Sequence, residues 1–389
     1  MGPPVRASPI PGEHSMTTFV EPVFNWFLPT RGDSDSPGFV PAFGDTKVRS
    51  GRRLPTLDYL TDIARAAEDA GFAAVLTPVG LGCPDPWVVC SAVASRTSRL
   101  GFIVAFRPSL SSPTLVAQQA DTFTRLHGDR LILNVTTGGD PLEQAAYGDF
   151  TDHDGRYEVT GEALEILAAL LAGERKSLQG RHISVRDAAL VAPTGIPVPL
   201  YFGGASPAAQ RVGARSADTY LLWGEPPDAI AARVSQLRAA AADQDRALRF
   251  GLRIHVLSRD TAAQAWQEAD RIQAGFDPAV VESVRNRKLQ MDSVGQQRMT
   301  ALHQESSRIS AADLTISPNL WAGIGLVREG VATAIVGSHD EVADRLVEYA
   351  DLGIDEFILS GYPHLEEATR VGTQVIPRVL ARRQTAVTA

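Results

Sequence analysis

Short apolar runs alternate with longer amphipathic segments along most of the chain. The apolar runs are rich in β-branched and aromatic residues, a pattern typical of parallel strands that are buried on both faces. The longer segments repeat their apolar positions with the period of a helix. We predict eight strands, at residues 23–30, 73–79, 100–107, 130–136, 200–203, 219–224, 250–258 and 356–361.

The helical segments fall between these strands. They are predicted at 56–70, 85–95, 113–126, 156–171, 206–216, 228–244, 262–274, 339–352 and 365–380. Residues 179–191 instead indicate a small surface hairpin that turns at Gln179 and Gly180. Either a closed barrel or an open doubly wound sheet fits this alternation.

The barrel is favoured because there are eight repeats and because polar residues follow many separate strands. An open sheet would gather them at one switch point, and no G-x-G-x-x-G follows the first strand. We therefore predict an α/β fold, a (β/α)8 TIM barrel with insertions, over residues 22–382. Residues 1–21, rich in Pro, Gly and small polar residues, are expected to be a disordered leader.

Residues 275–314 differ from the repeats. They are polar, poor in aromatic residues, and carry basic residues such as Arg285, Arg287 and Arg298. An insertion of this length after the seventh strand–helix unit is often a functional lid. A helical excursion that only decorates the surface is the alternative.

Composition narrows the class of protein. A chain of 389 residues with 44% hydrophobic residues suits one large barrel. The net charge of −8 disfavours a broad basic face for nucleic acid. Cys83 and Cys90 suggest neither a disulfide framework nor a zinc site. Without a long apolar run or a secretion signal, we expect a cytoplasmic protein that makes no membrane contact.

A barrel carries its site at the carboxyl ends of the strands. The polar and glycine residues there contain no carboxylate pair and no histidine-rich metal constellation, so glycosidase and metal chemistry are disfavoured. These residues are Arg31, Cys83, Arg107, Asn134, Thr136, Gly203, Gly204, Trp223, Arg253, His255, Tyr362 and His364.

Two local patterns suggest a ligand. In YFGGAS, two glycines precede Ser206 and the start of a helix, as in a phosphate-binding turn, although Ser206 as an ordinary helix cap fits equally well. Arg253 and His255 share one face of the seventh strand. A buried arginine there needs either an anionic ligand or a structural carboxylate.

Several segments together resemble alkanesulfonate monooxygenases, which are FMNH2-dependent enzymes of the bacterial luciferase-like family. Each match alone would be weak, but they occur in the same order from about residue 22 to 380. They are FNWFLPT, FRPSLSSPT, LNVTTGGDP, YFGGAS, LLWGEPP, FGLRIHV, DSVGQQRM, ISPNLWAGIGLVR and LSGYPHLEEA.

The resemblance implies a two-component monooxygenase that receives reduced FMN from a separate NAD(P)H-dependent reductase. With O2 as co-substrate, it would cleave an organosulfonate to an aldehyde and sulfite for sulfur acquisition. A homo-oligomer, either a dimer or a tetramer, is expected. The implied catalytic residues are Cys83, Arg253, His255, Arg298 and Tyr362, with Arg253 and Arg298 as sulfonate clamps and Arg298 on the lid.

Cofactor contacts are predicted for Asn134, Thr136, Tyr157, Gly203, Gly204 and Ser206, and substrate contacts for Arg31, Arg107, Trp223 and His364. Tyr362 and His255 are the candidates for handling a proton. Arg31 stands where the family commonly has histidine, and the basic loop to Leu54 is longer than expected. These departures leave three alternatives open: another organosulfur substrate such as methanesulfonate or dimethyl sulfone, a deazaflavin-dependent oxidoreductase, or a non-catalytic flavin-binding relative.

Overall fold

Eight parallel strands close into a barrel in the computed structural model, which describes residues 21–37, 52–303 and 310–388. The strands are β1 (Val23–Phe27), β2 (Ala74–Thr77), β3 (Gly101–Phe106), β4 (Leu131–Val135), β7 (Leu200–Gly203), β8 (Thr219–Trp223), β9 (Arg249–Arg259) and β13 (Glu356–Ser360). β13 pairs with β1, and β9 pairs with both β8 and β13, which completes the ring. The predicted TIM barrel and all eight predicted strands are confirmed. Residues 1–20 of the predicted leader at 1–21, and residues 38–51 of the basic loop, lie outside the described residues.

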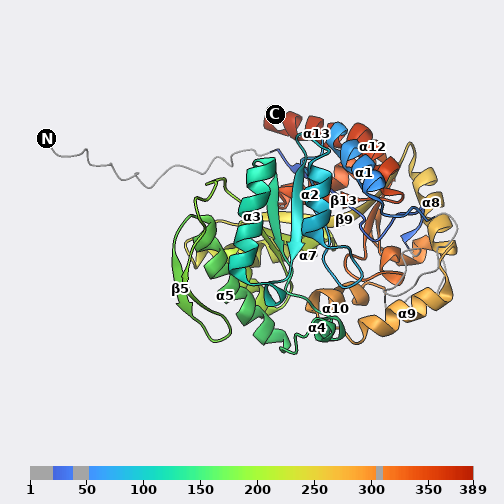
Figure 1. Cartoon of the computed structure of the whole chain (residues 1–389). Helices are drawn as coiled ribbons and strands as arrows, with labels where there is room; N and C mark the ends of the chain where they lie inside the picture. Colours follow the sequence, from blue (N-terminus) through green and yellow to red (C-terminus); the bar gives the residue numbers. More distant parts are fainter. Residues whose placement is uncertain (1–20, 38–51, 304–309, 389) are drawn as a thin grey trace, which may run out of the picture.

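Helices surround the barrel (Figure 1). They are α1 (Leu57–Asp69), α2 (Pro86–Ala94), α3 (Pro113–His127), α4 (Pro141–Ala146), α5 (His153–Leu171), α6 (Pro207–Ser216), α7 (Pro227–Ala242), α8 (Ala262–Ala274), α11 (His339–Asp351), α12 (His364–Arg370) and α13 (Ile376–Thr388). Side-chain caps set several starts: Thr56, Asp85 and Asp152 each accept a hydrogen bond from a backbone N–H in the first turn.

The predicted surface hairpin is present as β5 (Lys176–Gln179) and β6 (Ser184–Ala188). It begins three residues earlier than predicted, and Gly180 N donates to Ile183 O at its turn. The hairpin lies outside the barrel, against α5 (Figure 1).

β9 is longer than any other barrel strand, and its second half leaves the barrel. From His255 onward it pairs with β12 (Ala334–Ser338). β12 in turn pairs with β11 (Leu320–Trp321), and β11 pairs with β10 (Thr315–Ser317). This extension was not predicted, because its strands are short and β12 is built largely from small residues. This extension of the sheet brings the loop between β11 and β12 close to the second half of β9.

The insertion forms two helices, α9 (Pro278–Lys288) and α10 (Val294–Ala301), next to α4 in Figure 1. Three short 3-10 segments, η2 (Pro108–Leu110), η3 (Ala311–Leu314) and η4 (Gly323–Leu326), and one π turn, η5 (Val371–Val375), complete the elements named here. Residues 304–309 lie outside the described part of the insertion.

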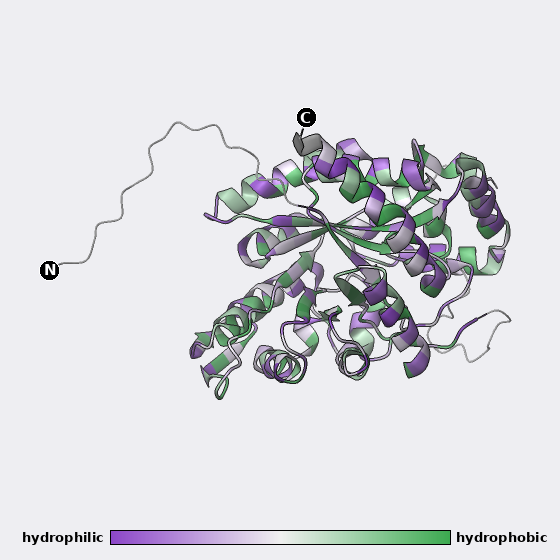
Figure 2. Ribbon diagram, turned by 90° about the horizontal axis from the view of Figure 1, so that it is seen from above, coloured by the Kyte–Doolittle hydropathy of each residue, from purple (hydrophilic) through white to green (hydrophobic). Residues whose placement is uncertain are grey.

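The main core lies between the barrel and its helices and includes the fully buried rings of Trp26, Phe102, Phe202 and Phe357. In Figure 2, hydrophobic residues run along the central strands, while the outer helices alternate between hydrophobic and hydrophilic residues. A smaller cluster fills the barrel interior, so the barrel is packed and its ligand space lies at one end. Among the described residues, no helix is long and apolar enough to cross a membrane.

Candidate active site

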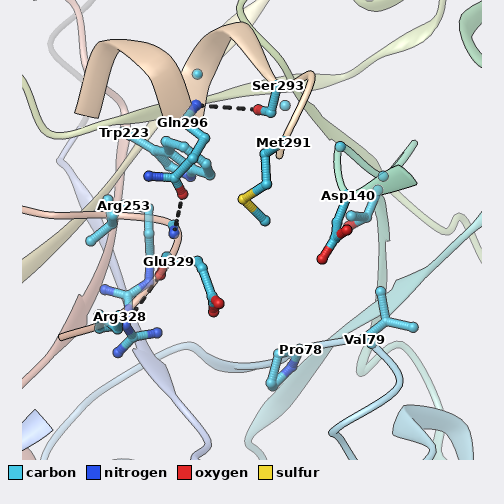
Figure 3. Close-up of a pocket in the computed structure, with 18 of the residues that line it drawn as sticks. Pro78, Val79, Asp140, Trp223, Arg253, Met291, Ser293, Gln296, Arg328 and Glu329 are labelled. Carbon is cyan, nitrogen blue, oxygen red and sulfur yellow. Dashed lines mark hydrogen bonds between the residues drawn. The ribbon is translucent and has the colours of Figure 1, made fainter. Parts of the chain in front are cut away.

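A cavity of about 1120 Å³ opens where the barrel strands end, and the insertion forms part of its wall. Thirteen of the fifteen predicted site residues line it: Arg31, Cys83, Arg107, Asn134, Thr136, Tyr157, Gly203, Gly204, Trp223, Arg253, Arg298, Tyr362 and His364. His255 and Ser206 are buried and do not line it. Figure 3 shows Arg253 and Arg328 side by side on one wall, with Met291 and Gln296 of the insertion above them.

Two arginines make one end of the cavity cationic. The guanidinium of Arg253 lies 4.8 Å from the ring centroid of Phe27, and that of Arg328 lies 6.0 Å from the same centroid. Burial lowers the pKa of Arg253 to about 9, and the charge of Arg328 adds to this. Within the described residues, Arg253 Nη1 donates to two backbone oxygens, those of Ile254 at 3.0 Å and Ile358 at 3.3 Å.

Neither arginine forms an ion pair with a carboxylate in the described part of the chain. Arg253 is buried and Arg328 is half-buried beside it; like charges held together in this way without a counter-ion are costly, and a bound anion would reduce that cost. The sequence leaves two possible partners for Arg253, an anionic ligand or a structural carboxylate. This geometry favours the anionic ligand.

Arg328 was not among the predicted site residues. It ends the segment ISPNLWAGIGLVR, and its guanidinium donates to the hydroxyl of Tyr362. Arg328 does not follow one of the predicted barrel strands; it precedes β12, a strand that was not predicted. The resemblance of this segment to alkanesulfonate monooxygenases was the signal that could have pointed to Arg328.

Tyr362 separates His255 from the cavity. Its ring stacks on His255, with centroids 5.6 Å apart, and meets His364 edge-on at 5.0 Å. His255 Nδ1 shares a hydrogen bond of 2.6 Å with Ser360 Oγ. Burial, with Arg253 and Arg328 adding to it, holds the pKa of His255 well below its usual value, so the ring is neutral. His255 therefore packs against the ring of Tyr362 and does not itself line the cavity.

The opposite end suits a phosphate. Ser206 Oγ accepts from Ala209 N at 3.1 Å, so the predicted cap of α6 is present, and Pro207 follows it. At Gly204, a Cβ would lie 2.4 Å from Ala209 Cβ and 3.4 Å from Tyr157 Oη. Because Gly204 has no side chain, the backbone of this turn stays uncovered beside the N-terminus of α6. Burial raises the pKa of Tyr157, whose hydroxyl therefore stays protonated and able to donate.

These residues fit the phosphate of FMN. The bare glycine turn, the start of α6 and the Tyr157 hydroxyl offer donors without any carboxylate among them. Asn134 and Thr136 at the end of β4, the neighbour of β7, also line the cavity.

Arg298 lies at this phosphate-side turn. Its Nη2 donates to Ala205 O at 3.2 Å, and its lowered pKa reflects burial together with the charge of Arg233. Arg298 and Arg253 are the predicted sulfonate clamps, but the arginine that lies beside Arg253 over Phe27 is Arg328. The placement makes Arg298 a candidate cofactor contact.

Arg107 is already paired. It is 6% exposed, forms an ion pair with Glu143 and donates to Gln144 Oε1. Its charge is therefore offset within the wall, and the predicted substrate contact of Arg107 has less support than a contact by Arg328.

Cys83 lines the cavity as a thiol, because burial raises its pKa. This position suits contact with a ligand more than attack as a thiolate. Trp223, at the end of β8, meets the insertion: a Cβ on Gly295 would lie 3.2 Å from its ring.

Ion pairs hold the insertion over the cavity. Arg287 bonds Asp140 at 2.9 Å and Glu329 at 3.1 Å, and Arg156 bonds Asp292 at 2.6 Å. These contacts tie α9 to the loops after β4 and before β12, and the segment before α10 to helix α5. The position agrees with the predicted lid, whose movement stays a prediction.

A packed barrel with a large cavity at the carboxyl ends of its strands, cationic at one end and phosphate-compatible at the other, defines an enzyme of the TIM-barrel class. The model of the luciferase-like monooxygenase family matches residues 24–356. The chain belongs to this family.

Several solved structures have a similar fold. EDTA monooxygenase from Chelativorans sp. BNC1 is 22% identical, with 93% of this chain and 94% of that chain covered and a TM-score of 0.71. A long-chain alkane monooxygenase is 19% identical, with 93% and 92% covered and a TM-score of 0.74. An F420-dependent secondary alcohol dehydrogenase is 16% identical, with 92% and 99% covered and a TM-score of 0.65. At these identities the likeness concerns the fold.

Proposed function

We propose that this protein is an FMNH2-dependent alkanesulfonate monooxygenase that takes its reduced FMN from a separate NAD(P)H-dependent reductase. One sulfonate, O2 and FMNH2 would give one aldehyde, sulfite, water and FMN. The observation that carries this proposal is the pair Arg253 and Arg328 over Phe27, without a carboxylate counter-ion in the described residues.

A sulfonate matches this pair chemically. It is a compact anion with three acceptor oxygens, and a guanidinium offers donors in a fixed planar fork. Charge-assisted hydrogen bonds to the sulfonate would offset the burial of Arg253 and the repulsion between the two cations. The bound anion would then lie against Tyr362, whose hydroxyl is held by Arg328.

Residues at the other end would hold the cofactor. Tyr157, the bare turn at Gly203 and Gly204, and the N-terminus of α6 would bind the phosphate of FMN. When bound, reduced FMN supplies the oxygen activation, and the protein supplies orientation and electrostatics. The insertion would exclude water from the cavity, because α9 and α10 cover it.

Membership of the family also supports two proposals about the partners of this protein. We propose that the protein works as a homo-oligomer, a dimer or a tetramer, and light scattering of the purified protein tests this. The reductase is proposed only by its chemistry, as an enzyme that releases free reduced FMN.

The test is sulfite release from a panel of organosulfonates, with a flavin reductase, NADH and FMN supplied. Sulfite from alkanesulfonates, with none formed when FMN is omitted, would support the proposal. Methanesulfonate belongs on the panel as the smallest sulfonate, and dimethyl sulfone as a substrate without the charge. Turnover of dimethyl sulfone alone would contradict it, because a neutral substrate does not need the arginine pair.

The cofactor is tested separately by titration. Tight binding of a deazaflavin, with no binding of FMN, would favour an oxidoreductase related to the F420-dependent structural neighbour. A flavin that binds without any turnover across the panel would instead favour a non-catalytic role.

A further inference from the structure

His364, at the start of α12, is held by a buried carboxylate. Asp33 Oδ1 lies 2.8 Å from His364 Nδ1, and Asp33 Oδ2 accepts from the His364 backbone N at 2.7 Å. Asp33 also accepts from Tyr59 Oη at 2.6 Å and from Ser34 N at 2.8 Å. The side chains of Asp33 and His364 are 0% and 3% exposed, so water does not compete with these bonds.

The contacts define the protonation of this pair. Burial alone would raise the pKa of Asp33, but His364 and Tyr59 together hold that pKa below its usual value. An ionised carboxylate only accepts hydrogen bonds, so Nδ1 of His364 must carry a hydrogen. In the neutral imidazole, Nε2 is then the bare acceptor nitrogen.

This Nε2 atom is left without a hydrogen-bond partner in the described residues. His364 lines the cavity, next to the edge of Tyr362 and 5.8 Å from the ring of Phe27, over which both arginines lie. A buried polar nitrogen without a partner is costly, and a ligand donor in the cavity would satisfy it.

The loop after β1 is built to hold Asp33 in this place. Asp33 and Arg53 exchange backbone hydrogen bonds of 3.0 and 2.8 Å, and Arg53 bonds Glu366 of α12 at 2.6 Å. Gly32 has φ of +104°, and a Cβ there would lie 3.0 Å from Arg53 O. These backbone bonds hold the loop that carries Asp33, and the Arg53–Glu366 ion pair ties the same loop to the helix that carries His364.

We propose that Asp33 is a positioning residue that holds His364 in the Nδ1–H tautomer, and that His364 Nε2 is the proton acceptor of the cavity. A ligand O–H or N–H bond breaks, and an Nε2–H bond forms. Asp33 balances the charge of the imidazolium, and the electron pair left on the ligand faces Arg253 and Arg328. The identity of that ligand rests on the proposed function, but the tautomer and its cause do not.

His255 cannot take this role in the same way. Its Nδ1 partner is the hydroxyl of Ser360, which can donate or accept and so does not set the tautomer. Tyr362 lies between it and the cavity, and the nearby cations Arg253 and Arg328 oppose its protonation. Of the two histidines on this wall, only His364 combines an anionic partner with a position on the cavity lining.

The tautomer is measured without turnover, on the full-length protein with ¹⁵N-labelled histidine. His364→Gln assigns the resonances. In the wild type, measured in the pH range where the ring is neutral, we expect a protonated Nδ1 and a bare Nε2, and in Asp33→Asn a shift of proton density between the two nitrogens. A wild-type Nε2–H, or an unchanged tautomer in Asp33→Asn, would overturn the proposal even if the sulfonate activity is confirmed.

A double-mutant cycle then tests the effect on turnover, using whichever substrate the panel identifies. Asp33→Asn and His364→Gln should each lower kcat by about 10²-fold or more, with KM changed by no more than about threefold. Because Asp33 acts through His364, the double variant should lose no more than His364→Gln alone. Losses that multiply would mean that Asp33 is only structural.

The chain offers a matched control in a second Asp–His pair, Asp260 and His339, whose Oδ1 and Nε2 atoms lie 3.2 Å apart outside the cavity lining. Asp260→Asn should leave kcat unchanged. Equal kcat values for Asp33→Asn and Asp260→Asn would refute the positioning role. If no substrate is turned over, the proposed function fails, while the tautomer experiment still decides this inference.

Discussion

The guanidinium of Arg253 lies beside that of Arg328, and both rest on the ring of Phe27, at 4.8 and 6.0 Å from its centroid. They come from different parts of the chain, β9 and the loop before β12. The quadrupole of the ring offsets part of their mutual repulsion, and a bound anion would offset more of it. Four predictions test this arrangement and its surroundings.

Arg328→Ala should lower kcat/KM for an alkanesulfonate by about 10- to 100-fold, the loss expected for one hydrogen bond to a charged group. Steady-state kinetics with sulfite detection measures it. The control is Arg382→Ala, because Arg382 pairs with Asp340 and Asp344 on the surface. An equal loss in both variants would argue against Arg328 as an anion contact.

Gly204→Ala should weaken FMN binding by about tenfold or more. The added Cβ would lie 2.4 Å from Ala209 Cβ, so the turn beside α6 must shift away from the phosphate. Quenching of flavin fluorescence gives the dissociation constant. Gly161→Ala is the control, since a Cβ there meets only Val212 Cγ2 at 3.9 Å. Unchanged affinity in Gly204→Ala would remove this turn from the flavin site.

Arg298→Ala should raise the dissociation constant for FMN, by about 10- to 100-fold if Arg298 contributes one charged contact to the phosphate. Its bond to Ala205 O places it at the glycine turn and not beside Arg253. Arg285→Ala, an exposed arginine of the same insertion, is the control. A normal FMN affinity with a large fall in kcat would instead restore the catalytic role first assigned to Arg298.

His255 should make the protein less stable in acid. Its pKa in the folded state lies well below the value of 6.5 expected in the unfolded state. The unfolded chain therefore binds the extra proton first, so stability present above pH 6.5 is lost as the pH falls below it. The loss is about 1.4 kcal/mol per pH unit until the folded-state pKa is reached.

Thermal unfolding of the wild type and His255→Asn at pH 7.5, 6.5 and 5.5 measures this effect. The variant is expected to be less stable at pH 7.5 but to lose less stability between pH 6.5 and 5.5. Parallel curves for the two proteins would contradict the shifted pKa of His255.

Much of this molecule follows from local sequence. Apolar runs separated by helical periods predicted all eight barrel strands, because a strand buried on both faces must be apolar almost throughout. Eleven of the thirteen predicted residues that line the cavity do so for a related reason: parallel strands that alternate with helices all end on the same face of a barrel. Family resemblance added Tyr157 and Arg298, which lie outside the strand ends.

Tertiary structure alone decided which of these residues meet. Arg328 reaches Tyr362 because β12 pairs with the outer half of β9, and Asp33 reaches His364 because β1 pairs with β13. The spacing of Asp33 and His364, which are 331 positions apart in the chain, carries no local signal. Hydrophobic periodicity reports the burial of one segment at a time, whereas contacts between side chains depend on how distant strands pair and in what register.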